Sequence, residues 1–242
     1  MAYQAVFRRY ELKYLLSAQQ RAAVLEALSG HMQPDRYGRV CIRNIYFDTD
    51  SYRLIRHSIE KPAYKEKLRI RSYSPAGAQD TVFVELKKKY DGLVYKRRLT
   101  LPLNTALGWL QGALPCPTDT QIGREIEYFR SFYGSLRPKV LLTYERVAYF
   151  SEEQPDFRVT FDENIQARQE HLQLDGSPEG QALLPEGMTL MEIKCAGGIP
   201  LWLTRVLTEK KIYKTSFSKY GTAYCSYIYP KNQEVATYEQ SF

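Results

Sequence analysis

The stretch 67-KLRIRSY-73 decides the fold, because cationic and aliphatic side chains alternate along it without a break. Such alternation is the period of a β-strand, in which successive side chains point to opposite faces. One face carries three cations and the other two aliphatic side chains: Lys67, Arg69 and Arg71 against Leu68 and Ile70. Either the cations face water, or they point inward at an anionic group.

Bulk composition is that of an ordinary globular chain with an excess of basic residues. The 242 residues are 44% hydrophobic and 25% charged, with a formal net charge of +7 that weakly favours an anionic partner. Four cysteines lie far apart without a C-x-x-C pair, which argues against a zinc site or a disulfide framework. Because no long apolar run occurs, we expect a cytoplasmic protein that reaches the inner face of a membrane only through a partner.

The rest of the chain has the patterns of strands interrupted by a few helices. Ser17 followed by Gln20 predicts a capping box, and Asp91-Gly92 between two alternating runs predicts a hairpin. The expected helices are 17–32, 104–112, 119–134 and 200–211. The expected strands, besides 67–73, are 40–49, 81–89, 93–101, 139–150, 157–165, 190–195 and 223–229.

Nearly every expected strand has one apolar face and one charged face. An open sheet with helices on one side and water on the other gives the same pattern. However, solvated faces tend to include Ser, Thr, Asn and Gln, whereas these faces repeat Arg, Lys and Glu. We therefore predict an α+β fold, a closed antiparallel β-barrel of about eight strands with helices packed outside. A basic interior of this kind needs a polyanionic ligand such as phosphate.

We interpret residues 1–242 as a single domain. The segment 166–189 is polar and contains Gly and Pro, so we expect a long loop there. The last residues, from about 230 to 242, are expected to form a tail.

Several segments, in this order along the chain, resemble one known family. They are 8-RRYELKYLLS-17, 44-NIYFDT-49, 67-KLRIRSY-73, 83-FVELKKK-89, 96-KRR-98, 143-TYERVAYF-150, 158-RVTFDENI-165, 191-MEIKC-195 and 217-FSKYGTAY-224. The chain resembles the VTC domain, the polyphosphate polymerase domain of the vacuolar transporter chaperone family, in a bacterial form. That family belongs to the triphosphate tunnel metalloenzymes, the CYTH-like superfamily.

The resemblance implies an eight-stranded antiparallel tunnel that binds phosphate chains and a divalent metal, Mn²⁺ or Mg²⁺. The catalytic positions carried over are Arg69, Arg71, Lys87 and Arg146. The substrate-binding positions are Lys13, Lys96, Arg98, Tyr144, Lys194, Ser218 and Lys219. The metal ligand is Glu192, with Glu11, Glu85 and Asp162 as secondary candidates. The favoured alternative for these three is that they orient Lys and Arg side chains. One departure is Ser216, where the eukaryotic polymerase has a lysine; Lys214 can take that place.

The resemblance favours a polymerase over a hydrolase. Hydrolytic and cyclising relatives carry E-x-E-x-K on the first strand, whereas this chain has 9-RYELK-13, with Arg9 at the first Glu position. Losing a carboxylate weakens metal binding, and gaining a cation strengthens polyanion binding. The expected reaction transfers the γ-phosphate of ATP onto inorganic polyphosphate, with Arg69, Arg71 and Arg146 on the transferring group.

Three alternatives stay open at this point. The first is a metal-dependent tripolyphosphatase or nucleoside triphosphatase on the same fold. The second is a binding module for polyphosphate or inositol phosphates that does not turn over ATP. The third, nucleic-acid binding, predicts an exterior basic patch, and we expect no nucleic-acid partner. A polymerase of this kind is expected to need a separate membrane protein that exports its product.

Overall fold

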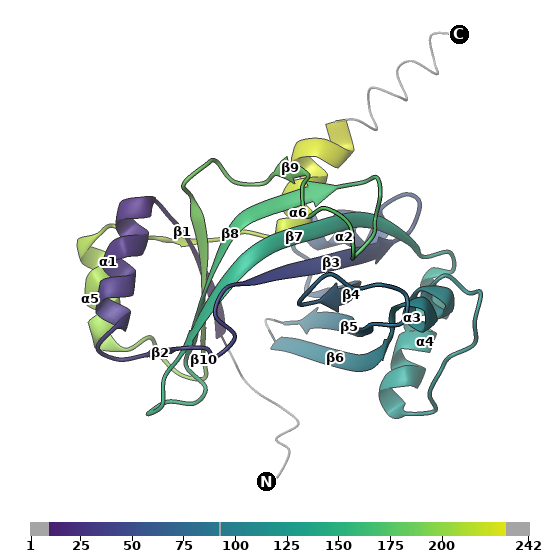
Figure 1. Ribbon diagram of the computed structural model, residues 1–242, viewed down its shortest axis with the longest axis horizontal. Coiled ribbons are helices and arrows are strands. Elements are labelled where there is room, and N and C mark those ends of the chain that lie inside the picture. The colour runs from purple at the N-terminus through teal and green to yellow at the C-terminus, as the bar shows by residue number, and fades with distance from the viewer. Residues whose placement is uncertain (1–9, 92, 231–242) are drawn as a thin grey trace. The chain divides into compact units, whose positions relative to one another are not determined.

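A computed structural model describes residues 10–91 and 93–230 (Figure 1). The chain divides into two compact units, each made of three segments. Unit 1 contains Met1–Cys41, Tyr144–Ile165 and Leu184–Phe217, and unit 2 contains Ile42–Thr143, Gln166–Leu183 and Ser218–Phe242. The single domain stays a prediction, and the tail expected near 230–242 lies almost wholly outside the described residues.

Unit 1 combines strands with two helices. Its elements are β1 (Tyr10–Leu16), α1 (Ala18–Leu28), β2 (Gln33–Pro34), β10 (Thr189–Cys195), α5 (Leu201–Glu209) and β11 (Lys214–Thr215). Most of β8 (Arg158–Arg168) and part of β7 (Arg137–Phe150) also belong to it. β1 pairs antiparallel with β10 and β11, and β10 pairs antiparallel with β8.

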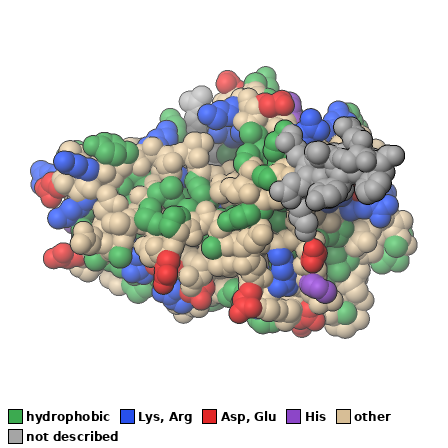
Figure 2. Space-filling model, turned by 90° about the horizontal axis from the view of Figure 1, so that it is seen from above, with side chains coloured by type: hydrophobic (Ala, Val, Ile, Leu, Met, Phe, Trp, Pro, Cys, Tyr) green, Lys and Arg blue, Asp and Glu red, His purple; other side chains and the backbone are tan. Residues whose placement is uncertain are grey.

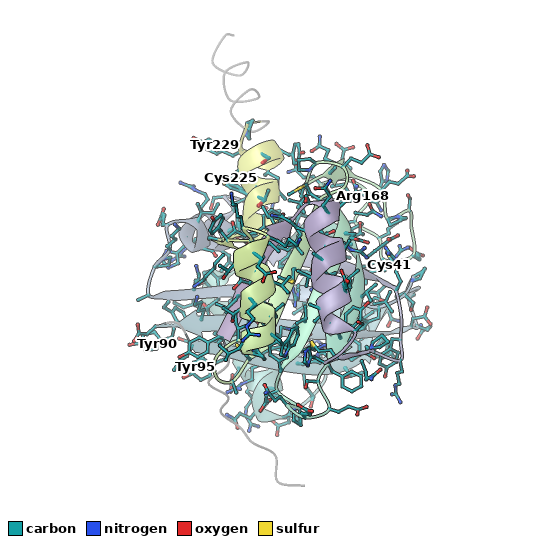
Figure 3. All side chains as sticks on the ribbon, turned by 90° about the vertical axis from the view of Figure 1, so that its left-hand side faces the viewer. Cys41, Tyr90, Tyr95, Arg168, Cys225 and Tyr229 are labelled. Atoms are coloured by element: carbon teal, nitrogen blue, oxygen red, sulfur yellow. The ribbon has the colours of Figure 1, made fainter. Side chains whose placement is uncertain are left out.

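The predicted capping box starts α1. The Ser17 hydroxyl accepts from the backbone N–H of Gln20, whose side chain accepts from the backbone N–H of Ser17. Helices α1 and α5 lie side by side (Figure 3). Val24 and Leu203, one from each helix, belong to the same apolar core as the strand residues Phe161 and Ile193. Burial of this apolar surface is what holds the two helices on the sheet.

Unit 2 is built around an antiparallel meander. Most of β3 (Val40–Asp48) pairs with β4 (Tyr64–Ser72), which pairs with β5 (Thr81–Tyr90), which pairs with β6 (Leu93–Pro102). The remaining elements are α2 (Arg53–Ile59), α3 (Leu103–Leu110), α4 (Gln121–Tyr133), β9 (Gln181–Ala182), α6 (Lys219–Ala223) and η1, a π-helix (Tyr224–Ile228). Tyr90 faces Leu93 across the predicted hairpin, whose Gly92 lies outside the described residues.

Alternation in the meander separates two kinds of surface. Leu68, Ile70, Val84 and Leu86 are fully buried in one core with Trp109 and other side chains of α3 and α4. On the opposite face, the odd-numbered positions carry Arg69, Arg71, Glu85 and several lysines, whereas Lys88 pairs with Glu66 on the even-numbered side. The opening stretch of the sequence therefore has its apolar side against helices, as predicted.

The closed barrel predicted from the sequence is not confirmed. Hydrogen-bonded neighbours follow the path β11-β1-β10-β8-β7-β3-β4-β5-β6, whose two ends are not paired in the part of the chain that the structure describes. Eight of the described strands have seven residues or more, namely β1, β3, β4, β5, β6, β7, β8 and β10. The coarser prediction, an α+β fold with a large antiparallel sheet, is confirmed.

One local prediction was wrong, and one helix was missed. The segment 223–229 is helical rather than a strand, because Ser218 starts α6 by accepting from the backbone N–H of Gly221 and the helix runs on into η1. Helix α2 was not predicted.

None of the helices within residues 10–91 and 93–230 is long and apolar enough to cross a membrane.

Candidate functional site

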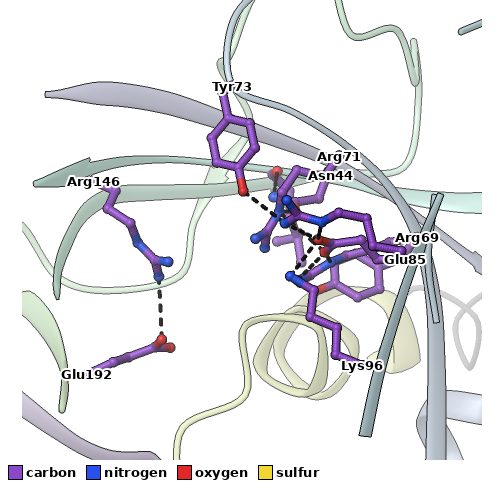
Figure 4. A network of polar contacts seen from close by, with 11 residues as sticks. Asn44, Arg69, Arg71, Tyr73, Glu85, Lys96, Arg146 and Glu192 are labelled. Carbon is purple, nitrogen blue, oxygen red and sulfur yellow. Dashed lines mark hydrogen bonds and ion pairs between the residues drawn. The ribbon is translucent and has the colours of Figure 1, made fainter. Parts of the chain in front are cut away.

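A buried carboxylate surrounded by cations lies on the charged face of the meander (Figure 4). Glu85, which is 1% exposed, accepts from Arg69 Nε at 2.8 Å and from Lys96 Nζ at 2.6 Å. Arg98 Nε donates to the same carboxylate at 2.8 Å, and Arg71 Nε lies 3.8 Å from it. Four cations thus surround one carboxylate, so this group, which we name the basic cluster, carries an excess of positive charge.

The basic cluster keeps Glu85 ionised. Burial alone would raise the pKa of Glu85, but Arg69, Arg71 and Lys96 outweigh burial and hold the pKa well below its usual range. Burial lowers the pKa of Lys96, and repulsion by Arg98 and Arg71 adds to this against the attraction of Glu85. An added anion is therefore stabilised here and an added cation is repelled.

Two side chains of β3 fix the arginines of the cluster. Arg69 Nη1 donates to the Tyr46 hydroxyl at 2.7 Å, and Arg71 Nε donates to Asn44 Oδ1 at 2.9 Å. Burial would raise the pKa of Tyr46, but Arg69 and Arg71 outweigh it and lower that pKa. Our sequence reasoning missed Asn44 and Tyr46, which are the cross-strand partners of Arg71 and Arg69.

A row of lysines crosses the strands next to the cluster. Lys67, Lys87 and Lys96 are direct cross-strand partners on β4, β5 and β6. Lys67 Nζ donates to Ser218 Oγ at 2.9 Å, and Lys219 is the first residue of α6. The predicted cations of β4, β5 and β6 therefore share one face, with Ser218 at its side.

The predicted residues of unit 1 form a second polar centre. Arg146 donates through Nε and Nη2 to the carboxylate of Asp162, which is fully buried, at 2.5 and 2.6 Å. Its Nη2 also lies 3.4 Å from Glu192 (Figure 4). Lys13 Nζ approaches the same carboxylate to 3.5 Å. Burial would lower the pKa of Arg146, but Tyr144 and Asp162 outweigh it and hold the pKa well above its usual range.

The carboxylates predicted as metal ligands differ in their neighbours. Glu85 is surrounded by cations, Asp162 gives both oxygens to a guanidinium, and Glu11 stands opposite Lys194 across β1 and β10. Across the described parts of the chain, no group of three or more His, Cys, Asp or Glu side chains is arranged to hold a metal ion. A divalent cation at Glu192 fits only if phosphate oxygens supply further ligands, which is how proteins commonly bind Mg²⁺.

A comparison of the sequence with protein-family models shows which family this chain belongs to. The VTC domain model matches residues 8–228, most of the chain. The chain belongs to the VTC domain family. The resemblance to this family, first seen in the quoted sequence segments, is therefore confirmed.

Solved structures share the fold of this VTC domain at low sequence identity. A "putative adenylate cyclase" from Bacillus halodurans has a TM-score of 0.53 and 17% identity, covering 89% of this chain and 96% of its own. A protein of the same description from Vibrio parahaemolyticus has a TM-score of 0.50 and 13% identity, covering 90% and 98%. No curated protein matches the sequence. At these identities the similarities show a shared fold and define no reaction.

Proposed function

We propose that this VTC domain is a polyphosphate polymerase that transfers the γ-phosphate of ATP onto a growing inorganic polyphosphate chain. The observation that carries the proposal is the basic cluster, in which four cations share one buried carboxylate. Buried cations without matching carboxylates are costly unless an anion compensates them. A polyphosphate chain has one negative charge at nearly every phosphate and suits such a face. The closed barrel predicted from the sequence stays part of this proposal.

Phosphoryl transfer between these groups does not require a covalent intermediate with the protein. A terminal phosphate oxygen is already anionic, so it attacks the γ-phosphorus without a general base. ADP leaves when the bond between the γ-phosphorus and its bridging oxygen breaks. Arg69 and Arg71, held by Tyr46 and Asn44, are oriented to neutralise charge on phosphoryl oxygens. Lys67, Lys87 and Lys96 hold neighbouring phosphates along the lysine row.

The second polar centre is proposed to bind phosphate and metal. Lys13 and Arg146 provide cations on either side of Glu192, and Asp162 orients the arginine. Glu192 is the carboxylate that would hold Mn²⁺ or Mg²⁺ together with phosphate oxygens. When bound, the divalent cation would neutralise charge that develops on the transferring phosphoryl group. Tyr144, whose ring lies 5.3 Å from the guanidinium carbon, limits where Arg146 can point.

Some expected partners go beyond the site itself. Inositol phosphates present the same anionic groups as polyphosphate and are possible ligands of the basic cluster. We propose that a separate membrane protein exports the product. We propose no nucleic-acid partner; in support, Lys and Arg on the face drawn in Figure 2 are interspersed with acidic and apolar side chains.

Phosphorus NMR on the protein incubated with ATP and Mn²⁺ tests the proposal. The expected result is a growing signal from internal chain phosphates alongside ADP. Orthophosphate without chain phosphates would mean a tripolyphosphatase or nucleoside triphosphatase. Intact ATP would leave a binding module. Arg69→Ala and Glu192→Ala are expected to abolish synthesis, and full synthesis by either variant would contradict the assignment.

A further inference from the structure

The charged face of the meander changes character along its length. Beyond the basic cluster, toward the end of β4 and the start of β5, it carries aromatic side chains, Tyr73 and Phe83. The ring centroids lie 5.6 Å apart in an edge-to-face arrangement. In the other direction come the lysine row and then Lys65 opposite Lys89. One end of the face is therefore aromatic, whereas the other is mainly cationic, with Val94 of β6 beside Lys89.

The aromatic end is joined to the basic cluster through Arg98. Its Nη2 donates to the Tyr73 hydroxyl at 3.1 Å, and its guanidinium carbon lies 4.5 Å from the centroid of the Phe83 ring. The same guanidinium donates to Glu85. Arg71 lies 5.9 Å from the Tyr73 centroid. These contacts fix the orientation of the Tyr73 ring, although this residue is still 40% exposed.

At the opposite end, like charges accumulate. Burial lowers the pKa of Lys65, and the charges of Lys89 and Lys61 add to this effect. The repulsion among these lysines is better compensated by a polyanion than by a single small anion, because the positive charges are spread along the strands. The order of side chains along the face, from aromatic rings through arginines to lysines, matches the order of groups in a nucleoside triphosphate that is extended by a phosphate chain: base, triphosphate, further phosphates.

We propose that Tyr73, supported by Phe83, is the nucleobase-binding residue, and that the phosphate chain runs from it over the basic cluster toward Lys65 and Lys89. The inference rests on the proposed function in taking ATP as the substrate. It adds which end of the face receives the base and in which direction the chain extends. Stacking on an exposed, immobilised ring contributes to binding of any base, so it predicts preference for nucleotides over inorganic triphosphate without strong base selectivity.

Calorimetric titration of ATP and of inorganic tripolyphosphate, without metal so that turnover is avoided, tests the assignment. Tyr73→Ala is expected to raise the Kd for ATP about tenfold and to change the Kd for tripolyphosphate less than twofold. Tyr73→Phe keeps the ring but loses the hydroxyl, and is expected to retain most of the preference for ATP. Tyr90→Ala removes a tyrosine that is 57% exposed at the far end of β5 and is expected to bind both ligands as the wild type does.

Three results would overturn the inference. They are an unchanged Kd for ATP in Tyr73→Ala, an equal loss for both ligands, or a Tyr73→Phe variant that behaves like Tyr73→Ala. Circular dichroism of each variant checks that it is folded. Because the readout is binding, absence of polyphosphate synthesis would defeat the proposed polymerase while leaving the nucleobase assignment to be decided by the two titrations.

Discussion

At the scale of single residues, Glu85 has the most unusual surroundings in unit 2. Its carboxylate is in contact with four cations, and it is almost completely buried. A metal ligand in this position would place a divalent cation among positive charges, which is unfavourable. Glu85 therefore acts as a positioning residue that holds the basic side chains in place.

Glu85→Gln is expected to lower the free energy of unfolding at pH 7 by about 3 kcal/mol, because it leaves Arg71, which is buried, and Arg69, which is largely buried, without their counter-charge. Urea unfolding followed by circular dichroism measures this. The same variant is expected to bind tripolyphosphate more tightly than the wild type, since one competing negative charge is gone. Glu60→Gln, at a glutamate whose side chain is 73% exposed, is the matched control and should change neither quantity. Weaker binding by Glu85→Gln would instead indicate a ligand-contacting role.

The lowered pKa of Glu85 also predicts how stability changes with pH. A glutamate in the unfolded chain titrates near pH 4, above the pKa of Glu85 in the folded protein. Stabilisation by this group is therefore present above about pH 4 and is lost as the pH falls further. Unfolding free energies measured at pH 5 and pH 3 should decrease more for the wild type than for Glu85→Gln. Equal decreases would contradict this.

Glu192 should behave differently from Glu85, because its proposed partner is a metal. Glu192→Gln is expected to reduce synthesis at least a hundredfold and to leave metal-free binding of tripolyphosphate within about threefold of the wild type. Initial rates at several Mn²⁺ concentrations measure the first effect and calorimetry the second. Glu186→Gln, at an exposed glutamate of the same unit, is the control. A variant with normal rates at all Mn²⁺ concentrations would exclude Glu192 as the metal ligand.

At the scale of elements, alternation predicted the long strands well, because each has one face against an apolar core. The same rule predicted which charges of β4, β5 and β6 share a face. It failed for 223–229, where Tyr and Ile suggested a strand but the capping serine and the contacts of Tyr220 favour a helix. Sequence periodicity also did not predict α2, because the start of this helix depends on hydrogen bonds to a side chain of β3.

That side chain is Asp48, which is fully buried at the end of β3. Its carboxylate accepts from the backbone N–H groups of Leu54 and Ile55 in α2 at 2.9 and 3.0 Å, and from the Tyr220 hydroxyl of α6 at 3.0 Å. One side chain thus satisfies free N–H groups at the start of α2 and holds α6, the helix that follows Ser218.

Asp48→Asn is expected to destabilise the protein by about 2 kcal/mol, because the amide NH₂ would face N–H donors and leave some of them unsatisfied. Thermal unfolding measures the change. Asp50→Asn, two residues along at a side chain that is 68% exposed, is the control and should have an effect below about 1 kcal/mol. Similar melting temperatures for wild type and Asp48→Asn would show that the carboxylate does not hold these two helices.

At the scale of the whole molecule, the sequence predicted the family and which charged residues would gather, but not the neutral residues that orient them. Asn44, Tyr46 and Tyr73 are uncharged, so the alternation of charges in the sequence does not point to them. Only their hydrogen bonds to the arginines identify them as orienting residues. Alternation also could not predict whether the sheet closes, because strands of an open sheet and of a barrel have the same two-residue period. The central claim concerns the face that binds phosphate, and β6 offers a direct test of it.

Adjacent arginines of β6 point to opposite faces of the strand. Arg98 belongs to the basic cluster, whereas Arg97 pairs with Glu125 of α4 at 2.9 Å. The decisive measurement is calorimetric titration of inorganic tripolyphosphate into wild type, Arg98→Ala and Arg97→Ala at the same salt concentration. Loss of a charged hydrogen bond in Arg98→Ala should weaken binding at least tenfold, and Arg97→Ala should bind within twofold of the wild type. Equal affinities of the two variants would contradict phosphate binding on this face.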